Sequence, residues 1–245
     1  TIGNAGLYEA LITGVCGTVL SSAANLTVTA GPIVNLQPAN QTVCEGGPVT
    51  FSVSATGTGL SYQWRKNGIA LGGATSSSYT IPSAMFSDAG SYDVLINNNC
   101  GGVASNAASL LINAGATINS QPVSQTICEG GPVTFSVSAT GTGLSYQWRK
   151  GGAFIEGATG SDYTIPSVAA GDGGNYDVIV TGACGTDTST VASLAVTAAK
   201  TINMQPVNQT VCEGVTVTFS VAATGTGLSY QWRKGGMNVE GATSS

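Results

Sequence analysis

The sequence predicts an all-β protein built from tandem β-sandwich domains arranged in a linear rod. Three observations support this prediction: one segment recurs at a fixed spacing, apolar and polar residues alternate along short stretches, and turn-forming residues separate these stretches. Alternation with a period of two is typical of strands that bury one face. Many short strands without an amphipathic helix favour a sandwich.

The recurring segment is QTVCEGGPVTFSVSATGTGLSYQWRK, at residues 41–66. It returns at residues 125–150 with one change and at residues 209–234 with three, always 84 positions further on. A fixed spacing of this kind indicates a repeat architecture. An 84-residue unit is too long for a two-helix repeat and about right for a small domain with its own core.

The spacing divides the chain into four pieces. Residues 1–30 align with the C-terminal part of a unit, residues 31–114 and 115–198 are complete units, and residues 199–245 align with the N-terminal part. A partial sandwich leaves apolar faces and strand edges open. We therefore expect either a window on a longer array or neighbouring copies that complete each other's halves.

Within a unit, the alternating stretches locate the strands in order. In the first complete unit we expect strands at residues 49–55, 60–64, 79–81, 92–96 and 110–112. Glycine-, proline- and asparagine-rich pieces between them, such as residues 45–48, 56–59 and 97–99, are typical of turns.

Composition and charge exclude several classes of function. Charged residues make up 8% of the chain and the net charge is −5, so the basic surface that a nucleic-acid partner needs is missing. The sequence has no histidine, which argues against a Ser-His-Asp triad and against zinc. We expect no enzyme activity, no cofactor and no metal. No apolar run is long enough for membrane insertion of this segment.

Six cysteines at two repeating positions predict disulfides and an oxidising compartment. One position precedes a strand, at Cys44 and its copies Cys128 and Cys212. The other follows a strand, at Cys100 and its copies Cys16 and Cys184.

Two motifs resemble the immunoglobulin fold, and most closely its intermediate set. Trp64 lies where strand C of that family places its core tryptophan, and Asp88-Ala89-Gly90-Ser91-Tyr92 matches the corner before strand F. The resemblance covers both complete units and both partial ones, so the first piece would hold strands F and G. It implies tandem immunoglobulin-like β-sandwich domains with these core residues: Trp64, Trp148, Trp232 and the corner tyrosines Tyr92 and Tyr176.

The chain departs from the family at the inter-sheet disulfide. Valine stands at both cysteine positions, at Val53 and Val94 in one unit and at Val137 and Val178 in the next. Apolar packing should therefore replace that bridge.

The register expected for strands B and F separates Cys44 from Cys100. One lies below the first turn of the sandwich and the other at its opposite end, on the order of 20 Å or more away. A disulfide needs Cα atoms within about 7 Å. We therefore predict a bond between neighbouring repeats, Cys44 to Cys184, with intradomain bridges as the alternative. Cys16, Cys100, Cys128 and Cys212 would then pair outside this window.

Tandem units with C-E-G before strand B and a late C-G turn resemble the stalk repeats of giant bacterial cell-surface adhesins, above all those of gliding bacteria that use type IX secretion. This resemblance implies an extracellular, cell-surface filament segment. Its partners would be neighbouring repeats or copies of the same chain, and a surface polysaccharide or a host or substratum surface.

Two other functions remain open. One is a glycan- or protein-binding array, whose contacts would lie in the variable stretches 67–78 and 151–162. Residues 85–88 and 169–172 are variable as well and are further candidates for such contacts. The other is a set of accessory domains on a larger secreted enzyme. The tryptophans could in principle stack on sugars, but the alternation turns them into the core.

Overall fold

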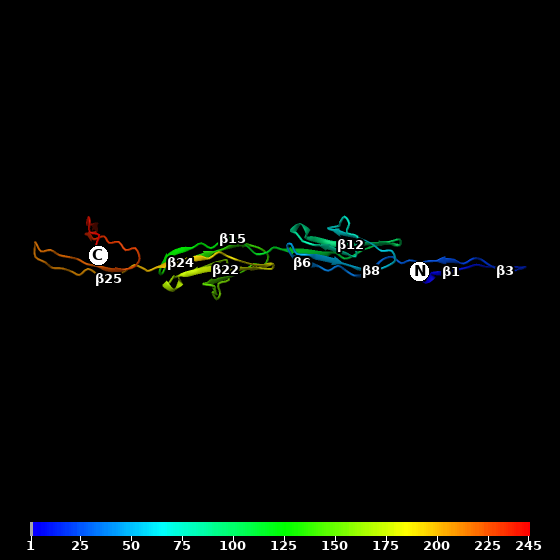
Figure 1. The fold of residues 1–245 in the computed structure, drawn as a ribbon, viewed down its shortest axis with the longest axis horizontal. Coiled ribbons are helices and arrows are strands. Elements are labelled where there is room, and N and C mark those ends of the chain that lie inside the picture. The colour runs from blue at the N-terminus through cyan, green and yellow to red at the C-terminus, as the bar shows by residue number, and fades with distance from the viewer. Residues whose placement is uncertain (1) are drawn as a thin grey trace. The chain divides into compact units, whose positions relative to one another are not determined.

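The computed structural model describes residues 2–245. The chain divides after Ala114 into two compact units, each with one complete sandwich (Figure 1). We call residues 31–114 the first repeat and residues 115–198 the second repeat. The all-β prediction is confirmed, because the regular structure of the described residues consists of strands and three short 3-10 helices.

The two repeats contain the same elements in the same order. The first repeat consists of β5 (Ile33–Leu36), β6 (Gln41–Cys44), β7 (Val49–Ser52), β8 (Ser54–Thr56), β9 (Ser61–Lys66), β10 (Ile69–Ala70), β11 (Ser78–Ile81), η2 (Phe86–Asp88), β12 (Gly90–Asn98), β13 (Gly101–Ala104) and β14 (Ala108–Asn113). The second repeat consists of β15 (Thr117–Ser120), β16 (Gln125–Cys128), β17 (Val133–Ser136), β18 (Ser138–Thr140), β19 (Ser145–Lys150), β20 (Ala153–Phe154), β21 (Asp162–Ile165), η3 (Ala170–Asp172), β22 (Gly174–Gly182), β23 (Gly185–Thr188) and β24 (Ala192–Thr197).

The remaining elements lie outside the repeats. Before the first repeat come η1 (Ile2–Asn4), β1 (Gly6–Tyr8), β2 (Leu11–Gly14), β3 (Gly17–Leu20) and β4 (Ala24–Leu26). After the second come β25 (Thr201–Met204), β26 (Ala222–Thr224), β27 (Arg233–Lys234) and β28 (Met237–Asn238).

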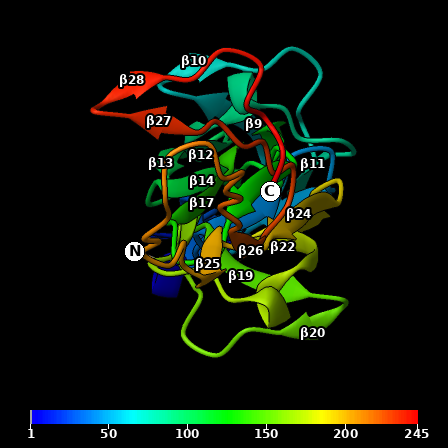
Figure 2. The same ribbon diagram turned by 90° about the vertical axis from the view of Figure 1, so that its left-hand side faces the viewer.

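The larger sheet of the first repeat has the order β10-β9-β12-β14-β6, and β13 pairs with β12 beside it. Strands β14 and β6 run parallel, whereas the other neighbours run antiparallel. The pairs β7–β11 and β5–β8 form the rest of the repeat. The second repeat has the same pairings, and β20 projects from the body of its sandwich (Figure 2).

The single strand expected over residues 49–55 is two strands. β7 pairs with β11, whereas β8 pairs with β5, so the strand changes its neighbour at Val53. Val53 is buried and its amide donates to the carbonyl of Ser77 at 3.0 Å. The alternation of apolar residues continues through this change of partner, which is why the sequence shows no break.

Apolar side chains from both layers form the core of each repeat. In the first repeat Phe51 from β7 meets Trp64 from β9 and Tyr92 from β12, and all three are at most 1% exposed. Val53 and Val94, at the positions of the family's inter-sheet cysteines, belong to the same core.

The segments outside the repeats follow the register of the complete sandwiches. Tyr8 lies opposite Ala24 as Tyr92 lies opposite Ala108, and the β2–β3 pairing matches β12–β13 in the same way. At the other end, β25–β26 and β27–β28 match β15–β18 and β19–β20. Many apolar side chains of these segments are exposed.

Among the described residues, no helix has the length and apolar character that a membrane crossing needs.

A buried serine joins β12 to the loop before β14, and the alternating pattern gave no sign of it. The Ser105 hydroxyl accepts from the Val94 amide at 3.1 Å and donates to the carbonyl of Asn106 at 2.9 Å. Ser189 makes the same bonds in the second repeat.

Substituting Ser105 by alanine should leave the buried Val94 amide without its side-chain acceptor. We expect the free energy of unfolding of the first repeat to fall by about 1–3 kcal/mol in denaturant titrations. The exposed Ser109→Ala is the matched control and should change stability by less than about 0.5 kcal/mol. Equal effects of the two substitutions would contradict the assigned role of Ser105.

Candidate functional site: the cysteine loops

Cys44 ends β6, and main-chain hydrogen bonds hold the loop that follows it. The Glu45 amide donates to the carbonyl of Asn113 at 3.0 Å, and the Gly46 amide donates to that of Ala84 at 2.7 Å. Gly46 has a φ of +83°, a conformation that costs other residues about 1–2 kcal/mol. The second repeat builds its equivalent loop with the same bonds. The loop therefore fixes the cysteine backbone at the end of the larger sheet.

Cys100 and Cys184 occupy the tip of the long hairpin in each repeat. Each lies in a two-residue turn, between β12 and β13 or between β22 and β23. The next residue is Gly101 or Gly185, with φ of +135° and +112°. These turns present the cysteine at the outermost point of the hairpin.

The cysteines fall into two bonding states. Cys44 and Cys184 are disulfide-bonded. The other cysteines, Cys16, Cys100, Cys128 and Cys212, are exposed free thiols. The pairing of Cys44 with Cys184, and external partners for the four thiols, stay predictions.

The intradomain bridges left open by the sequence are absent. Each would need a cysteine that is free here, Cys100 for Cys44 and Cys128 for Cys184. The strand order gives the reason, because Cys44 and Cys100 lie at opposite ends of the nine-residue strand β12. Such a strand spans roughly 27 Å, far more than a disulfide can bridge.

The tryptophans predicted for the core differ in burial. Trp64 and Trp148 are fully buried, whereas Trp232, after the second repeat, is half-buried. In all three the indole donates to a main-chain carbonyl twelve residues later, at 2.9–3.0 Å. A sugar could not reach the indole face of Trp64 or Trp148 without opening the sandwich.

The corner tyrosines Tyr92 and Tyr176 are both buried beside a stacked phenylalanine. The Tyr92 hydroxyl donates to the carbonyl of Asp88 at 2.7 Å, and its ring stacks on Phe51 with centroids 4.7 Å apart. Burial, with a smaller contribution from the negative charge of Asp88, raises the pKa of Tyr92 to about 12. Burial likewise raises the pKa of Tyr176 to about 12.

The arginines after Trp64 and Trp148 form ion pairs within their own repeats. Arg65 and Asp93 form an ion pair between β9 and β12, and Arg149 and Asp177 form its copy. The hydrogen bond to Asp93 raises the pKa of Arg65. Both arginines are therefore neutralised by an aspartate on the neighbouring strand and do not form a free basic surface. Sequence analysis missed their partners.

The described residues show no candidate metal site. No three His, Cys, Asp or Glu side chains within residues 2–245 come together in a way that could hold a metal ion. Asp88 instead accepts from the Met85 amide at 2.9 Å and so closes the turn before β12.

Residues 32–98 and 116–196 each match a sequence family described as an immunoglobulin domain. Both repeats are immunoglobulin-like domains. The first match lies within the first repeat and the second match within the second repeat.

Solved structures of tandem immunoglobulin domains share this fold. The I-band fragment I67–I69 from titin is 18% identical, with a TM-score of 0.68 over 86% of this chain and 82% of that one. Sidekick-1 immunoglobulin domains 1–5 are 20% identical, with a TM-score of 0.58 over 99% of this chain and 57% of that one. At these identities the likeness concerns the fold alone.

The relatives by sequence have different functions. The muscle M-line assembly protein unc-89 of Caenorhabditis elegans is 27% identical over 97% of this chain and 3% of its own length. The decoration protein of Escherichia phage T5 is 43% identical over 33% of this chain and 47% of its own. Endoglucanase C of Cellulomonas fimi is 31% identical over 44% of this chain and 10% of its own. The chain thus spans less than half the length of each of these relatives.

The bonded cysteines indicate the compartment. Stable disulfides in immunoglobulin-like domains are typical of oxidising environments, so the chain has an extracytoplasmic location.

The corner tyrosines make alkaline stability a test of the buried core. Tyrosine in the unfolded chain ionises near pH 10, whereas Tyr92 and Tyr176 stay neutral in the folded chain up to about pH 12. The contribution of these two hydroxyl groups to the free energy of unfolding is therefore fully present below pH 10. It is lost as the pH rises toward 12.

We expect urea unfolding curves to show a stability that declines steadily from pH 10 to pH 12. Replacing both tyrosines by phenylalanine should make this decline shallower. A double variant whose stability falls as steeply as that of the unmodified chain would show that these hydroxyls are not the buried ones.

Proposed function

We propose that the chain is a load-bearing stalk or filament segment of a secreted bacterial cell-surface adhesin, stiffened by disulfides between neighbouring repeats. The observation that carries the proposal is the pair of disulfide-bonded cysteines, Cys44 and Cys184. Cys44 ends strand β6 and Cys184 lies in a hairpin turn, each in a domain with its own core. The motifs around the cysteines further favour an adhesin of the gliding, type IX secretion class.

A bond from Cys44 to Cys184 would change the path of a pulling force. Tension along the chain would pass through the disulfide and bypass residues 45–183, which include most of both repeats. The same bond would close a loop of about 140 residues and stabilise the folded state by roughly 5 kcal/mol on the chain-entropy account. The proposed function is thus reach and tensile strength.

In this proposal the chain is not an enzyme and uses no cofactor. Its partners are neighbouring repeats or copies of itself, together with a surface polysaccharide or a host or substratum surface. Nucleic acid is not among them, and this segment does not insert into a membrane. The Arg65–Asp93 ion pair supports the statement on nucleic acid, because it neutralises a basic side chain. The absence of histidine supports the statement on enzyme activity.

Exposed apolar side chains favour a second candidate, a glycan- or protein-binding array or an accessory domain of a secreted enzyme. Ile69 and Phe154 are 74% and 70% exposed on the hairpins of the variable stretches. The likeness to endoglucanase C and to a phage decoration protein is consistent with this role. Adsorption to cellulose that Phe154→Ala abolishes would favour this candidate over the stalk.

Tryptic digestion without reductant tests the disulfide. Cleavage after Arg65, Lys66, Arg149, Lys150 and Lys200 separates the bonding patterns. We expect peptide 1–65 joined to peptide 151–200, and the same product from a Cys16→Ser variant. In the Cys16→Ser variant, a peptide of residues 67–149 joined to either of these would show that Cys44 or Cys184 has another partner and would sink the proposal.

Stretching single molecules from their ends tests the load path. The oxidised chain should withhold residues 45–183 from extension, and Cys44→Ser should release roughly 480 Å of contour length in two unfolding steps. Cys128→Ser removes one of the free thiols and is the matched control, which should behave like the unmodified chain. Release of this length from the oxidised, unmodified chain would contradict the proposal.

A further inference from the structure

Asn67 and Gly68 form the two-residue turn that joins β9 to β10. Both residues have positive φ, +51° and +81°, which is the geometry of a type I′ hairpin turn. Among residues 2–245, Asn67 alone combines a side chain with a positive φ. The equivalent turns, at residues 151–152 and 235–236, consist of two glycines. The asparagine is therefore a feature of this one turn.

An asparagine that precedes a glycine can modify itself. The main-chain nitrogen of Gly68 attacks Cγ of the Asn67 side chain, the bond from Cγ to the amide nitrogen breaks, and ammonia leaves with the proton of the Gly68 nitrogen. Water then opens the cyclic imide at either of its two carbonyls and yields aspartate or isoaspartate. Glycine favours the attack because no Cβ shields its nitrogen. The sequence contains no second Asn-Gly pair.

The folded first repeat holds the Asn67 side chain against β12. Its Oδ1 atom accepts from the Ser91 amide at 2.9 Å, and the Asn67 amide donates to the carbonyl of Ser91 at 2.8 Å. Gly90 leaves room for this contact, because a Cβ there would lie 2.9 Å from Oδ1. The imide ring requires Cβ of Asn67 and the nitrogen of Gly68 to eclipse each other about the Cα–C bond, a rotation that the type I′ turn does not have. The turn must therefore open before the reaction starts.

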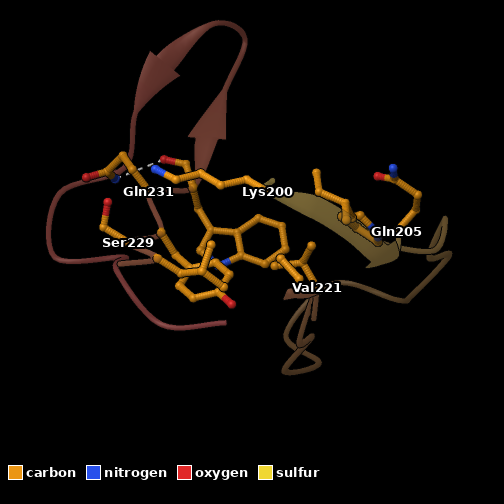
Figure 3. Close-up of a pocket in the computed structure, with 11 residues that line it drawn as sticks. Lys200, Gln205, Val221, Ser229 and Gln231 are labelled. Atoms are coloured by element: carbon orange, nitrogen blue, oxygen red, sulfur yellow. Dashed lines mark hydrogen bonds between the residues drawn. The ribbon is translucent and has the colours of Figure 1, made fainter. Parts of the chain in front are cut away.

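A glutamine fastens the base of the same hairpin. The side-chain amide of Gln63 donates to the carbonyls of Trp64 and Leu71, at 3.0 and 2.7 Å. Gln147 and Gln231 make the corresponding bonds in the other two copies, and Figure 3 shows Gln231. The hairpin is thus closed at its tip by β12 and at its base by Gln63, so its turn opens when this part of the first repeat unfolds.

We propose that Asn67 is a self-modifying site whose deamidation records the time that the first repeat spends open. The chain is its own substrate, water is the co-reactant and ammonia is the product. The observed rate is the rate in the open chain multiplied by the fraction of molecules that are open. This inference does not depend on the bond between Cys44 and Cys184, so its failure would leave the proposed function standing.

The isoaspartate product does not fit the two-residue turn. Its main chain runs through Cβ and Cγ, so the connection between Lys66 and Ile69 becomes one atom longer, and the former amide oxygen becomes a main-chain carbonyl. The aspartate product keeps an acceptor for the Ser91 amide but adds a negative charge. Opening therefore leaves a permanent chemical change, and the isoaspartate form closes less readily than the original turn.

Prolonged incubation in mildly alkaline buffer, with and without urea that fully unfolds the chain, tests the site. Digestion after glutamate then releases residues 46–129, in which Asn67 is internal, and mass spectrometry locates each amide converted to an acid. We expect conversion at Asn67 in urea and at least about tenfold slower conversion in the folded chain. Asn67→Gly, which installs the turn of the second repeat, should abolish it. The other asparagines of this peptide are internal controls.

The dependence on urea tests the protection. The rate at Asn67 should rise together with the unfolding of the first repeat, followed in parallel by amide hydrogen exchange. Ser105→Ala should move the rate and the unfolding transition to lower urea together, whereas Ser109→Ala should leave both in place. Equal rates in the folded and unfolded chain, a rate that does not follow the transition, no conversion in the unfolded chain, or faster conversion at another asparagine would overturn the proposal.

Discussion

Each repeat is held together by aromatic packing across its two layers. Phe51 of one layer stacks on Tyr92 of the other, with the Trp64 ring 6.2 Å away. Removing a buried tryptophan typically costs about 3–5 kcal/mol, which is comparable to the contribution of a disulfide. Because this packing joins the layers, the positions of Val53 and Val94 need no bridge. The cysteines lie instead at the ends of the sandwich, where we propose that they link neighbouring repeats.

The fold could be predicted because its signals are local or periodic. The spacing of 84 residues located the units, alternation located most strands, and the sequence around Trp64 and Tyr92 indicated the family. The short strands β5, β6, β10 and β13 were missed, since they lie among turn residues and bury few side chains. The break at Val53 was missed because a change of pairing partner leaves the alternation intact.

The polar contacts could not be predicted, since they depend on which residues face each other across strands. The ion pair of Arg65 with Asp93 joins positions 28 apart, and the bond from Val94 to Ser105 joins β12 to the loop before its neighbour. The spacing of neither pair forms a pattern that can be recognised in a single sequence. The bonding state of the cysteines is a similar case, because at each of the two repeating positions one cysteine is bonded and two are thiols.

The indole bond of each tryptophan spans only twelve residues, and Trp232 forms it in the same way as Trp64 and Trp148. Such short-range contacts can form quickly, because closing a small loop has a low entropic cost. A polypeptide threaded through an export channel emerges from one end first. Each newly emerged half-unit could therefore hold its shape while it waits for the rest, which favours orderly vectorial folding over aggregation of neighbouring, nearly identical units.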